Sequence, residues 1–540
     1  MDQKLYRNAD FVPMTEEGAS FEAMVVEDGV IAFTGTLEDA RAFAPSAREV
    51  DLEGRAVMPG FIDGHGHFMM AGQMVTQADL SQCQSFEDIK EVLRAFIADN
   101  GITPDRAVLG CGYDQNELLE RRHPDRFVLD EVSTDIPILI SQVSGHMGVV
   151  NSKGLALVGV TAETPDPEGA RYGRVGDSRE PDGYLEEVNA IMPAMEAFAA
   201  RNPSDKAEVV RKVHDIYASN GITTCQDGAS VKMFVDDFVS VIENEDIVKI
   251  DVVGYPMVAM DWEDVHAAYP QYFGEEYRNH FRFGGLKIVL DGSPQGRTAW
   301  MSEPYSPGSE GEGWRAYPAY EDDEVKRHAK TAVDGGYQLL AHCNGDAASD
   351  QLLRCYREAY EASGNPGKDD LRPVMIHCQT ARRDQYESMA ELGMIPSIFT
   401  AHIWYWGDVH LKNFGLERGS RVSAVHDALE CGLVYNFHTD TPIVPPNMLH
   451  TVWCAVNRVT KRGVQLAEDQ KVGVYDALKG ITVNPAYAYH EEGRKGTLEV
   501  GKLADLAILD RNPLKVDPMD IRGIKVVETV KEGETIWKRA

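Results

Sequence analysis

The sequence predicts an α/β protein: a (β/α)8 TIM barrel with a small β-sandwich domain built from both termini and an insertion after barrel strand 1. Three observations predict it. Apolar strands alternate with helical stretches through the middle of the chain, both ends carry short strands separated by turn residues, and 540 residues exceed one ordinary domain. A doubly wound sheet is the alternative architecture, since it has the same alternation.

The two ends each hold too few strands for a separate core. Residues 21–35 are expected to form two strands around the Asp28-Gly29 turn, and residues 48–52 a third. Residues 504–509 and 524–537 are expected to be strands near the other end. We therefore expect residues 1–56 and 490–540 to pair into one composite β-sandwich domain.

Residues 57–489 carry the barrel pattern of alternating strands and helices. The strand candidates are 57–62, 223–226, 250–256, 283–290, 337–341, 374–376, 395–400 and 433–437. The helical candidates are 205–219, 322–334, 347–362, 385–392 and 421–431. The gap after the first strand is too long for one crossover, so an insertion is expected at about 70–205, with strands at 107–110 and 136–142.

Charge and composition restrict the partners. The chain has 53 Lys and Arg against 86 Asp and Glu, a net charge of −33, which repels nucleic acid and anionic membrane surfaces. An apolar run of membrane-spanning length and a signal peptide are both absent from the sequence. The eight cysteines form no C-x-x-C pair, which favours reduced thiols in a cytoplasmic protein. A homodimer is the default oligomeric state.

The strongest local signal is the segment PGFIDGHGH, residues 59–67. An apolar strand ends there in His65 and His67, which point to one side because side chains alternate along a strand, with Asp63 on the same face. Two neutral imidazoles on one face make half of a zinc site. The alternative is a surface or core histidine pair without metal.

Four more candidates lie at predicted strand ends: Lys287, His342, His377 and Asp440. In a parallel barrel these ends converge on one rim, where catalytic groups are found. Taken singly, each histidine is more often a hydrogen-bonded core residue and the lysine more often reaches solvent. Together they predict a shared metal site.

Several segments resemble the amidohydrolase superfamily, in particular its formamide-deformylase-like branch, amidohydrolase family 3. They are VMPGFIDGHGHF, KIVLDGSPQGRTA, AHCNGDAA, MIHCQT, HTDTP and GTLEVGKLADLAILDRNP, in the same order and at similar spacing over nearly the whole chain. MIHCQT and HTDTP depart from the more usual family forms without removing a ligand. The resemblance implies a metal-dependent hydrolase barrel with a terminal β-sandwich.

The resemblance also implies roles for individual residues. It implies that the metal ligands are His65, His67, Lys287, His342, His377 and Asp440. The expected cofactor is Zn²⁺, as one or two ions, with Mn or Fe as alternatives. In many relatives the lysine matched by Lys287 is carboxylated and bridges two metals; a single-metal site with Lys287 unmodified is the alternative.

Further polar and aromatic residues are expected to line a pocket for a small-molecule substrate: Tyr113, His146, Asp291, His402, Trp406 and His438. Of these, His146 matches a Gly-His pair that relatives place near the substrate. Alternatives stay open for the others: Asp291 could cap a turn, His438 could hydrogen bond the rim, and His402 and Trp406 could pack a rim helix.

The predicted function is hydrolysis of an amide, N-acyl or N-formyl C–N bond, other than a peptide bond, by attack of a metal-activated water. Asp440 is the expected catalytic residue, acting as general base and then general acid. The alternatives are a non-hydrolytic decarboxylase or isomerase on the same metal site, and a catalytically silent binding or regulatory barrel.

Overall fold

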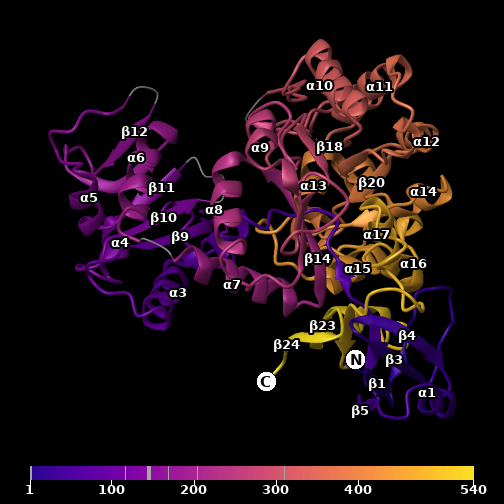
Figure 1. The fold of residues 1–540 in the computed structure, drawn as a ribbon. Coiled ribbons are helices and arrows are strands. Elements are labelled where there is room, and N and C mark those ends of the chain that lie inside the picture. The colour runs from indigo at the N-terminus through magenta and orange to yellow at the C-terminus, as the bar shows by residue number, and fades with distance from the viewer. Residues whose placement is uncertain (1–2, 116, 143–146, 168–169, 203–204, 309–310) are drawn as a thin grey trace. The chain divides into compact units, whose positions relative to one another are not determined.

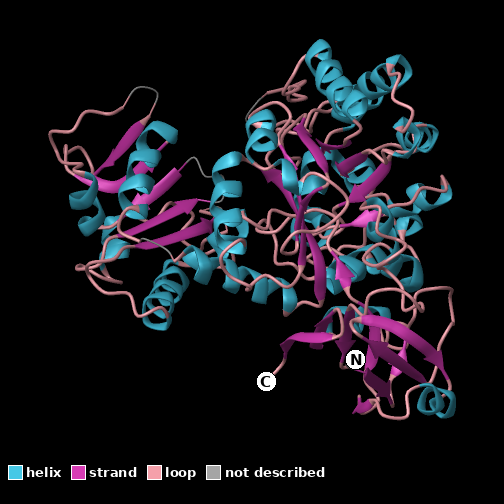
Figure 2. Cartoon of the chain, viewed as in Figure 1, coloured by secondary structure: helices cyan, strands magenta, loops and turns pink. Residues whose placement is uncertain are grey.

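The structure is a computed structural model that describes residues 3–115, 117–142, 147–167, 170–202, 205–308 and 311–540. The chain is a mixed α/β protein, as predicted (Figures 1 and 2). It divides into two compact units, one made of residues 1–70 and 213–540 and the other of residues 71–212. Each unit is described by itself.

Two parallel sheets form the centre of the first unit. Their strand orders are β16-β15-β14-β7 and β17-β18-β19-β20-β21. The strands are β7 (Phe61–Ile62), β14 (Ile222–Ser230), β15 (Asp251–Pro256), β16 (Phe281–Phe283), β17 (Gly285–Val289), β18 (Gln338–Cys343), β19 (Val374–His377), β20 (Ile395–Ile398) and β21 (Asn436–Phe437). A parallel bridge between Met257 and Lys287 and a hydrogen bond from Gly64 N–H to Phe437 O (3.1 Å) join the two sheets.

Helices lie along the outside of these strands (Figure 1). They are α8 (Lys232–Ile242), α9 (Trp262–Ala268), α10 (Asp322–Gly335), α11 (Asp346–Ala362), α12 (Arg383–Glu391), α13 (His402–Ser420), α14 (Val425–Glu430), α15 (Met448–Asn457), α16 (Val474–Lys479) and α17 (Val483–Ala488). Helix α7 (Lys206–Ala218) begins in the second unit and ends in the first. The parallel strands are buried on both faces, which explains their continuous apolar sequences.

Two predicted single strands are each broken at a glycine. Residues 57–62 divide at Gly60 into β6 (Ala56–Pro59) and β7, and a Cβ at Gly60 would overlap the Thr223 side chain. Residues 283–290 divide at Gly284, where a Cβ would lie 2.6 Å from the Tyr255 hydroxyl. Each predicted strand therefore contributes to two different sheets.

Two predicted elements are shorter than expected. The helix expected at 421–431 begins only at α14, because Ser423 adopts a positive φ of 54°, and Gly432 with a φ of 70° follows its end. The strand expected at 433–437 is reduced to β21.

The two chain ends together build two further sheets, with orders β4-β3-β1-β5 and β2-β6-β22-β23-β24. Their strands are β1 (Gln3–Arg7), β2 (Asp10–Phe11), β3 (Ala23–Glu27), β4 (Val30–Gly35), β5 (Arg48–Asp51), β6, β22 (Leu506–Leu509), β23 (Val526–Lys531) and β24 (Glu534–Lys538); α1 (Leu37–Phe43) lies between β4 and β5. Side chains from both ends share one apolar core, including Tyr6, Met24, Leu506 and Val530.

The second unit has a six-stranded mixed sheet of order β12-β13-β11-β10-β9-β8. Its strands are β8 (Ala78–Asp79), β9 (Val108–Tyr113), β10 (Ile138–Gln142), β11 (Met147–Val150), β12 (Arg171–Arg174) and β13 (Pro181–Glu186). Its helices include α3 (Phe86–Asp99), α4 (Arg126–Asp130), α5 (Ser152–Val158) and α6 (Val188–Ala199). Strands β9 and β10 correspond to the two strands predicted for this region.

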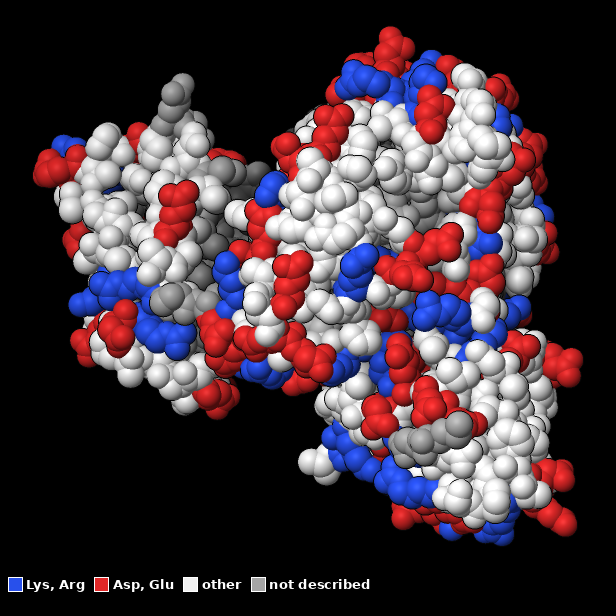
Figure 3. Space-filling view, viewed as in Figure 1, with Lys and Arg blue, Asp and Glu red and all other residues white. Residues whose placement is uncertain are grey.

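The surface carries both signs of charge. Acidic and basic side chains alternate in small groups across the face seen in Figure 3. All eight cysteines are free, six of them buried. Among the helices that the structure describes, none is long and apolar enough to cross a membrane.

Candidate metal centre

His65 and His67 follow β7 directly, where the carboxyl ends of the parallel strands meet. The backbone N–H of His67 donates to the carbonyl of Thr441 (2.7 Å), and the N–H of Asp440 donates to the carbonyl of His65 (3.0 Å). These two bonds hold the segment after β7 against the segment after β21. Side chains that are far apart in the sequence therefore meet.

Asp63 supports this junction. Its carboxylate accepts hydrogen bonds from the backbone N–H groups of His65 (3.3 Å) and Thr439 (3.1 Å) and from the Thr439 hydroxyl (2.5 Å). Burial raises the pKa of Asp63 to about 7, although these donors act in the opposite direction. Asp63, expected on the same face as the two histidines, thus holds the backbone that presents them.

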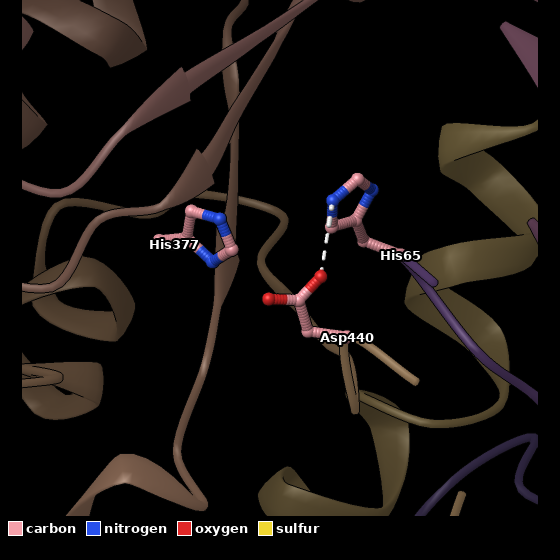
Figure 4. A group of neighbouring side chains, drawn as sticks. All are labelled: His65, His377 and Asp440. Atoms are coloured by element: carbon pink, nitrogen blue, oxygen red, sulfur yellow. Dashed lines mark ion pairs between the residues drawn. The ribbon is translucent and has the colours of Figure 1, made fainter. Parts of the chain in front are cut away.

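Two imidazoles converge on one carboxylate oxygen. His67 Nε2 lies 3.2 Å from Asp440 Oδ1, and His65 Nε2 lies 3.6 Å from the same atom. One donor atom from each of His65, His377 and Asp440 lies within 4.8 Å of the others. Figure 4 shows these three side chains pointing toward one another from separate segments of the chain.

These spacings fit a divalent cation. Two ligands on one tetrahedral zinc, each with a metal bond of about 2.0–2.1 Å, lie about 3.3 Å apart. The two measured nitrogen–oxygen distances, 3.2 and 3.6 Å, lie on either side of that value. The buried Nδ1 atom of His342 also lacks a hydrogen-bond partner among the described residues. Imidazole nitrogens with a carboxylate oxygen are donors that suit zinc, and they also accept iron or manganese.

The amine of Lys287, on β17, lies next to the imidazole of His65. Its Nζ lies 3.4 Å from His65 Nε2, and the side chain is buried. Burial lowers the pKa of Lys287 to about 7, while the Asp440 carboxylate partly opposes the shift. A substantial share of the amine is therefore neutral at neutral pH.

His342 and His377 come from adjacent strands, β18 and β19. Their ring centroids are 4.5 Å apart, and those of His65 and His377 are 5.7 Å apart. Burial lowers the pKa of His65 and of His377 well below the usual value, with neighbouring positive charges adding to the shift. Both imidazoles are thus neutral and can offer a lone pair to a cation.

Asp440 is the carboxylate of this group. Burial by itself would raise the pKa of Asp440, but the hydrogen bond from His67 and the charge of Lys287 keep the pKa below its usual value. Asp440 is therefore ionised at neutral pH. It adopts a left-handed backbone conformation, with a φ of 56°, between β21 and the following turn.

Four of the residues expected near the substrate lie in the first unit: Asp291, His402, Trp406 and His438. Asp291 accepts backbone N–H bonds from Trp300 (3.0 Å), Asn344 (2.9 Å) and Gly345 (2.7 Å), and so holds the loop ends after β17 and β18 together. His402 begins α13; its Nδ1 lies 3.0 Å from His410 Nε2, and its ring centroid is 4.4 Å from that of Trp406.

The Asp291 carboxylate also lies close to one of the predicted metal ligands, His342. Asp291 Oδ1 lies 3.2 Å from His342 Nδ1, without the alignment of a hydrogen bond. His438 bridges two strands: its Nε2 lies 3.1 Å from His377 Nδ1, and its Nδ1 lies 2.8 Å from the Ser397 hydroxyl. Asp291 and His438 thus contact predicted metal ligands.

Of the other two predicted residues, Tyr113 belongs to the second unit. Tyr113 ends β9, is fully buried in that unit's core, and its hydroxyl lies 2.9 Å from His123 Nδ1. His146 lies outside the described residues. Both remain predictions.

Three residues around the site were not predicted. Gln226 on β14 places its Oε1 2.5 Å from His65 Nδ1, and Ser397 on β20 contacts His438. Gly228 leaves room for the His65 ring, because a Cβ there would overlap it. The signal for Ser397 was a polar residue inside an otherwise apolar strand. Gln226 lies in a buried strand that holds several other polar residues, so the sequence did not single it out.

The sequence of the chain matches one protein-family model over most of its length. The model of the amidohydrolase family matches residues 48–537. The chain belongs to the amidohydrolase family. This confirms the predicted family and makes the protein a metal-dependent hydrolase with a small-molecule substrate.

Relatives cover the chain almost completely. An N-substituted formamide deformylase of Arthrobacter pascens is 27% identical over 98% of both chains, and a putative amidohydrolase, YtcJ, of Bacillus subtilis is 25% identical over 98% of both. Among solved structures, an uncharacterized metal-dependent hydrolase of Pyrococcus horikoshii is similar with a TM-score of 0.75 and 25% identity, over 96% of this chain and 99% of that one.

Proposed function

We propose that this amidohydrolase cleaves a non-peptide C–N bond of an amide, an N-acyl compound or an N-formyl compound. The observation that carries the proposal is the convergence of His65 Nε2 and His67 Nε2 on Asp440 Oδ1, with Lys287 Nζ 3.4 Å from His65. The similarity to an N-substituted formamide deformylase favours N-formyl substrates as the first to try.

The residues that would hold the cation are His65, His67, Lys287, His342, His377 and Asp440. We propose zinc, as one or two ions, with manganese or iron as alternatives. When bound, such an ion polarises the substrate carbonyl and lowers the pKa of a water molecule. The neutral imidazoles and the ionised carboxylate described above are in the protonation states that metal binding requires.

Lys287 is proposed to be carboxylated when two ions are bound. Its pKa of about 7 leaves enough neutral amine to attack carbon dioxide. The Nζ–carbon bond forms, one proton leaves to solvent, and the product is an anionic carbamate with two donor oxygens. If two cations were bound, this carbamate would supply the negative charge that offsets their repulsion, which an unmodified lysine cannot provide.

Asp440 is proposed to move the proton during hydrolysis. Its ionised carboxylate accepts a proton from the attacking water as the new carbon–oxygen bond forms. It then returns that proton to the nitrogen as the C–N bond breaks, so the amine leaves neutral and the acid keeps the solvent oxygen.

We also propose the finer architecture and setting expected from the sequence. The two parallel sheets would close into a (β/α)8 barrel, the terminal sheets would form a β-sandwich, and residues near 70–205 would be an insertion. The Met257–Lys287 bridge and the Gly64–Phe437 bond support closure, because they join the sheets at two separate places. The free cysteines favour the cytoplasm.

Product analysis in ¹⁸O-labelled water tests the function. The zinc-loaded protein is incubated with N-substituted formamides, N-acyl amino acids and cyclic amides, and the acid product is analysed by mass spectrometry. We expect one ¹⁸O atom in the acid and a kcat about 10²–10⁴-fold lower for Asp440→Asn. Turnover that places no solvent oxygen in a product, or full activity of Asp440→Asn, would refute the proposal.

A further inference from the structure

A row of three buried side chains leads away from the metal group. His377 Nδ1 lies 3.1 Å from His438 Nε2, and His438 Nδ1 lies 2.8 Å from Ser397 Oγ. His377 ends β19, Ser397 lies within β20, and His438 follows β21. All three side chains are at most 3% exposed, so bulk water does not replace these contacts.

The protons in such a row are linked. A neutral imidazole carries its single proton on one nitrogen and offers a lone pair on the other. If His377 binds a cation through Nε2, its proton must be on Nδ1 and must be donated to His438 Nε2. The proton of His438 is then on Nδ1 and is donated to Ser397 Oγ.

The opposite direction would block the metal site. If the Ser397 hydroxyl donated to His438 Nδ1, then His438 Nε2–H would donate to His377 Nδ1, and the proton of His377 would sit on Nε2. That arrangement removes the lone pair from the atom that faces the cation. An imidazolium form of His438 would place a further charge in a buried site next to the ion.

The Nδ1–H of His65 is held in the same way, by an oxygen that can only accept a hydrogen bond. Its Nδ1 lies 2.5 Å from Gln226 Oε1, while Gln226 Nε2 donates to Gly64 O (3.2 Å) and the Tyr489 hydroxyl (3.1 Å). Gln226 can therefore only accept from His65, whose Nε2 is left facing Lys287 and Asp440. Histidines that bind metals commonly donate their other N–H in this way.

We propose that His438 and Ser397 are positioning residues that hold His377 in its Nδ1–H form, so that Nε2 binds the catalytic cation. This inference rests on the proposed function. Both ring nitrogens of His438 are engaged within the chain, which supports the hydrogen-bonding role that the sequence left open beside substrate binding.

The test compares His438→Leu with His438→Gln. Gln keeps a carbonyl oxygen that can accept from His377, whereas Leu removes the acceptor and keeps similar bulk. The dissociation constant for zinc is measured on chelator-stripped protein by competition with a chromophoric chelator, and the visible spectrum is recorded after cobalt substitution. We expect Leu to weaken zinc binding about 10–100-fold and to change the cobalt spectrum, and Gln to restore most of both.

Ser397→Ala and Thr400→Val separate positioning from general damage. Both remove a buried hydroxyl near the end of β20, but the Thr400 hydroxyl donates to the carbonyl of Thr451 (2.8 Å), away from His438. We expect Ser397→Ala to weaken zinc binding and Thr400→Val to leave it unchanged.

Wild-type zinc affinity and an unchanged cobalt spectrum in both His438→Leu and Ser397→Ala would overturn the inference and leave the proposed function standing. Equal losses in Ser397→Ala and Thr400→Val would also overturn it. A wild-type chain that binds neither zinc nor cobalt would overturn both proposals.

Discussion

At the scale of single residues, the residues packed around the proposed metal ligands determine where those ligands lie. Gly228 illustrates this, because any side chain there would occupy the space of the His65 ring. His65 would have to turn away from Gln226 and from Asp440. A glycine with no role in binding or catalysis thus controls the position of a predicted metal ligand.

We expect Gly228→Ala to weaken zinc binding about 10–100-fold, as other losses of support around metal ligands do. The measurement is chelator competition on stripped protein. Gly364→Ala is the matched control, since a Cβ at Gly364 meets nothing within 4 Å and its φ is not positive. Equal zinc affinities for Gly228→Ala and wild type would contradict this account of His65.

The sequence singles out the candidate ligands but not the residues that support them. His65, His67 and Asp440 stand out because imidazoles and a carboxylate follow apolar strands. Gln226 and Ser397 are ordinary polar residues, and only contacts across 161 and 41 positions give them a role. Pairings over such distances cannot be inferred from local patterns.

At the scale of elements, α13 carries a buried histidine that makes the fold sensitive to acid. His410 is fully buried, and its Nδ1 has no partner among the described residues. Burial lowers the pKa of His410 to about 3. In the unfolded chain the same group has a pKa of about 6.5.

Because the folded pKa is depressed below the unfolded one, stability is complete above about pH 6.5 and falls as the pH decreases toward 3. We expect this residue to cost about 1.4 kcal/mol per pH unit, or about 2 kcal/mol between pH 6.5 and 5. His410→Gln keeps a polar group toward His402 but does not titrate, so its unfolding midpoint should fall less between pH 7 and pH 5. Parallel pH curves for the two proteins would show that His410 does not titrate on unfolding.

For two strands, the hydrophobic pattern did not predict that the strand is divided. The periodicity at 57–62 and 283–290 is continuous, yet Gly60 and Gly284 each divide a strand between two sheets. The Thr223 and Tyr255 side chains approach these glycines closely, which a hydrophobic pattern does not record. By contrast, α10 and α11 begin and end within one or two residues of prediction, because their amphipathic pattern is long.

At the scale of the first unit, a buried charge network joins the terminal sheets to the parallel sheets. Lys531 on β23 contacts Asp251 on β15 (2.9 Å) and Asp505 (3.1 Å), and Lys495 also contacts Asp251 (2.7 Å). All four side chains are at most 5% exposed. Such a network favours one docking arrangement, because a misplaced partner would leave a buried charge unpaired.

This fold matters for function because the proposed ligands come from five distant segments, within or shortly after β7, β17, β18, β19 and β21. A complete site therefore depends on the whole set of parallel strands.

The central claim is that these segments enclose a divalent cation. The direct measurement is calorimetric titration of chelator-stripped protein with zinc, with bound metal counted by mass spectrometry. We expect one or two ions per chain in the wild type and loss of binding when His65 and Asp440 are both replaced by alanine. A wild-type chain without bound metal, or a double variant that retains it, would contradict the claim.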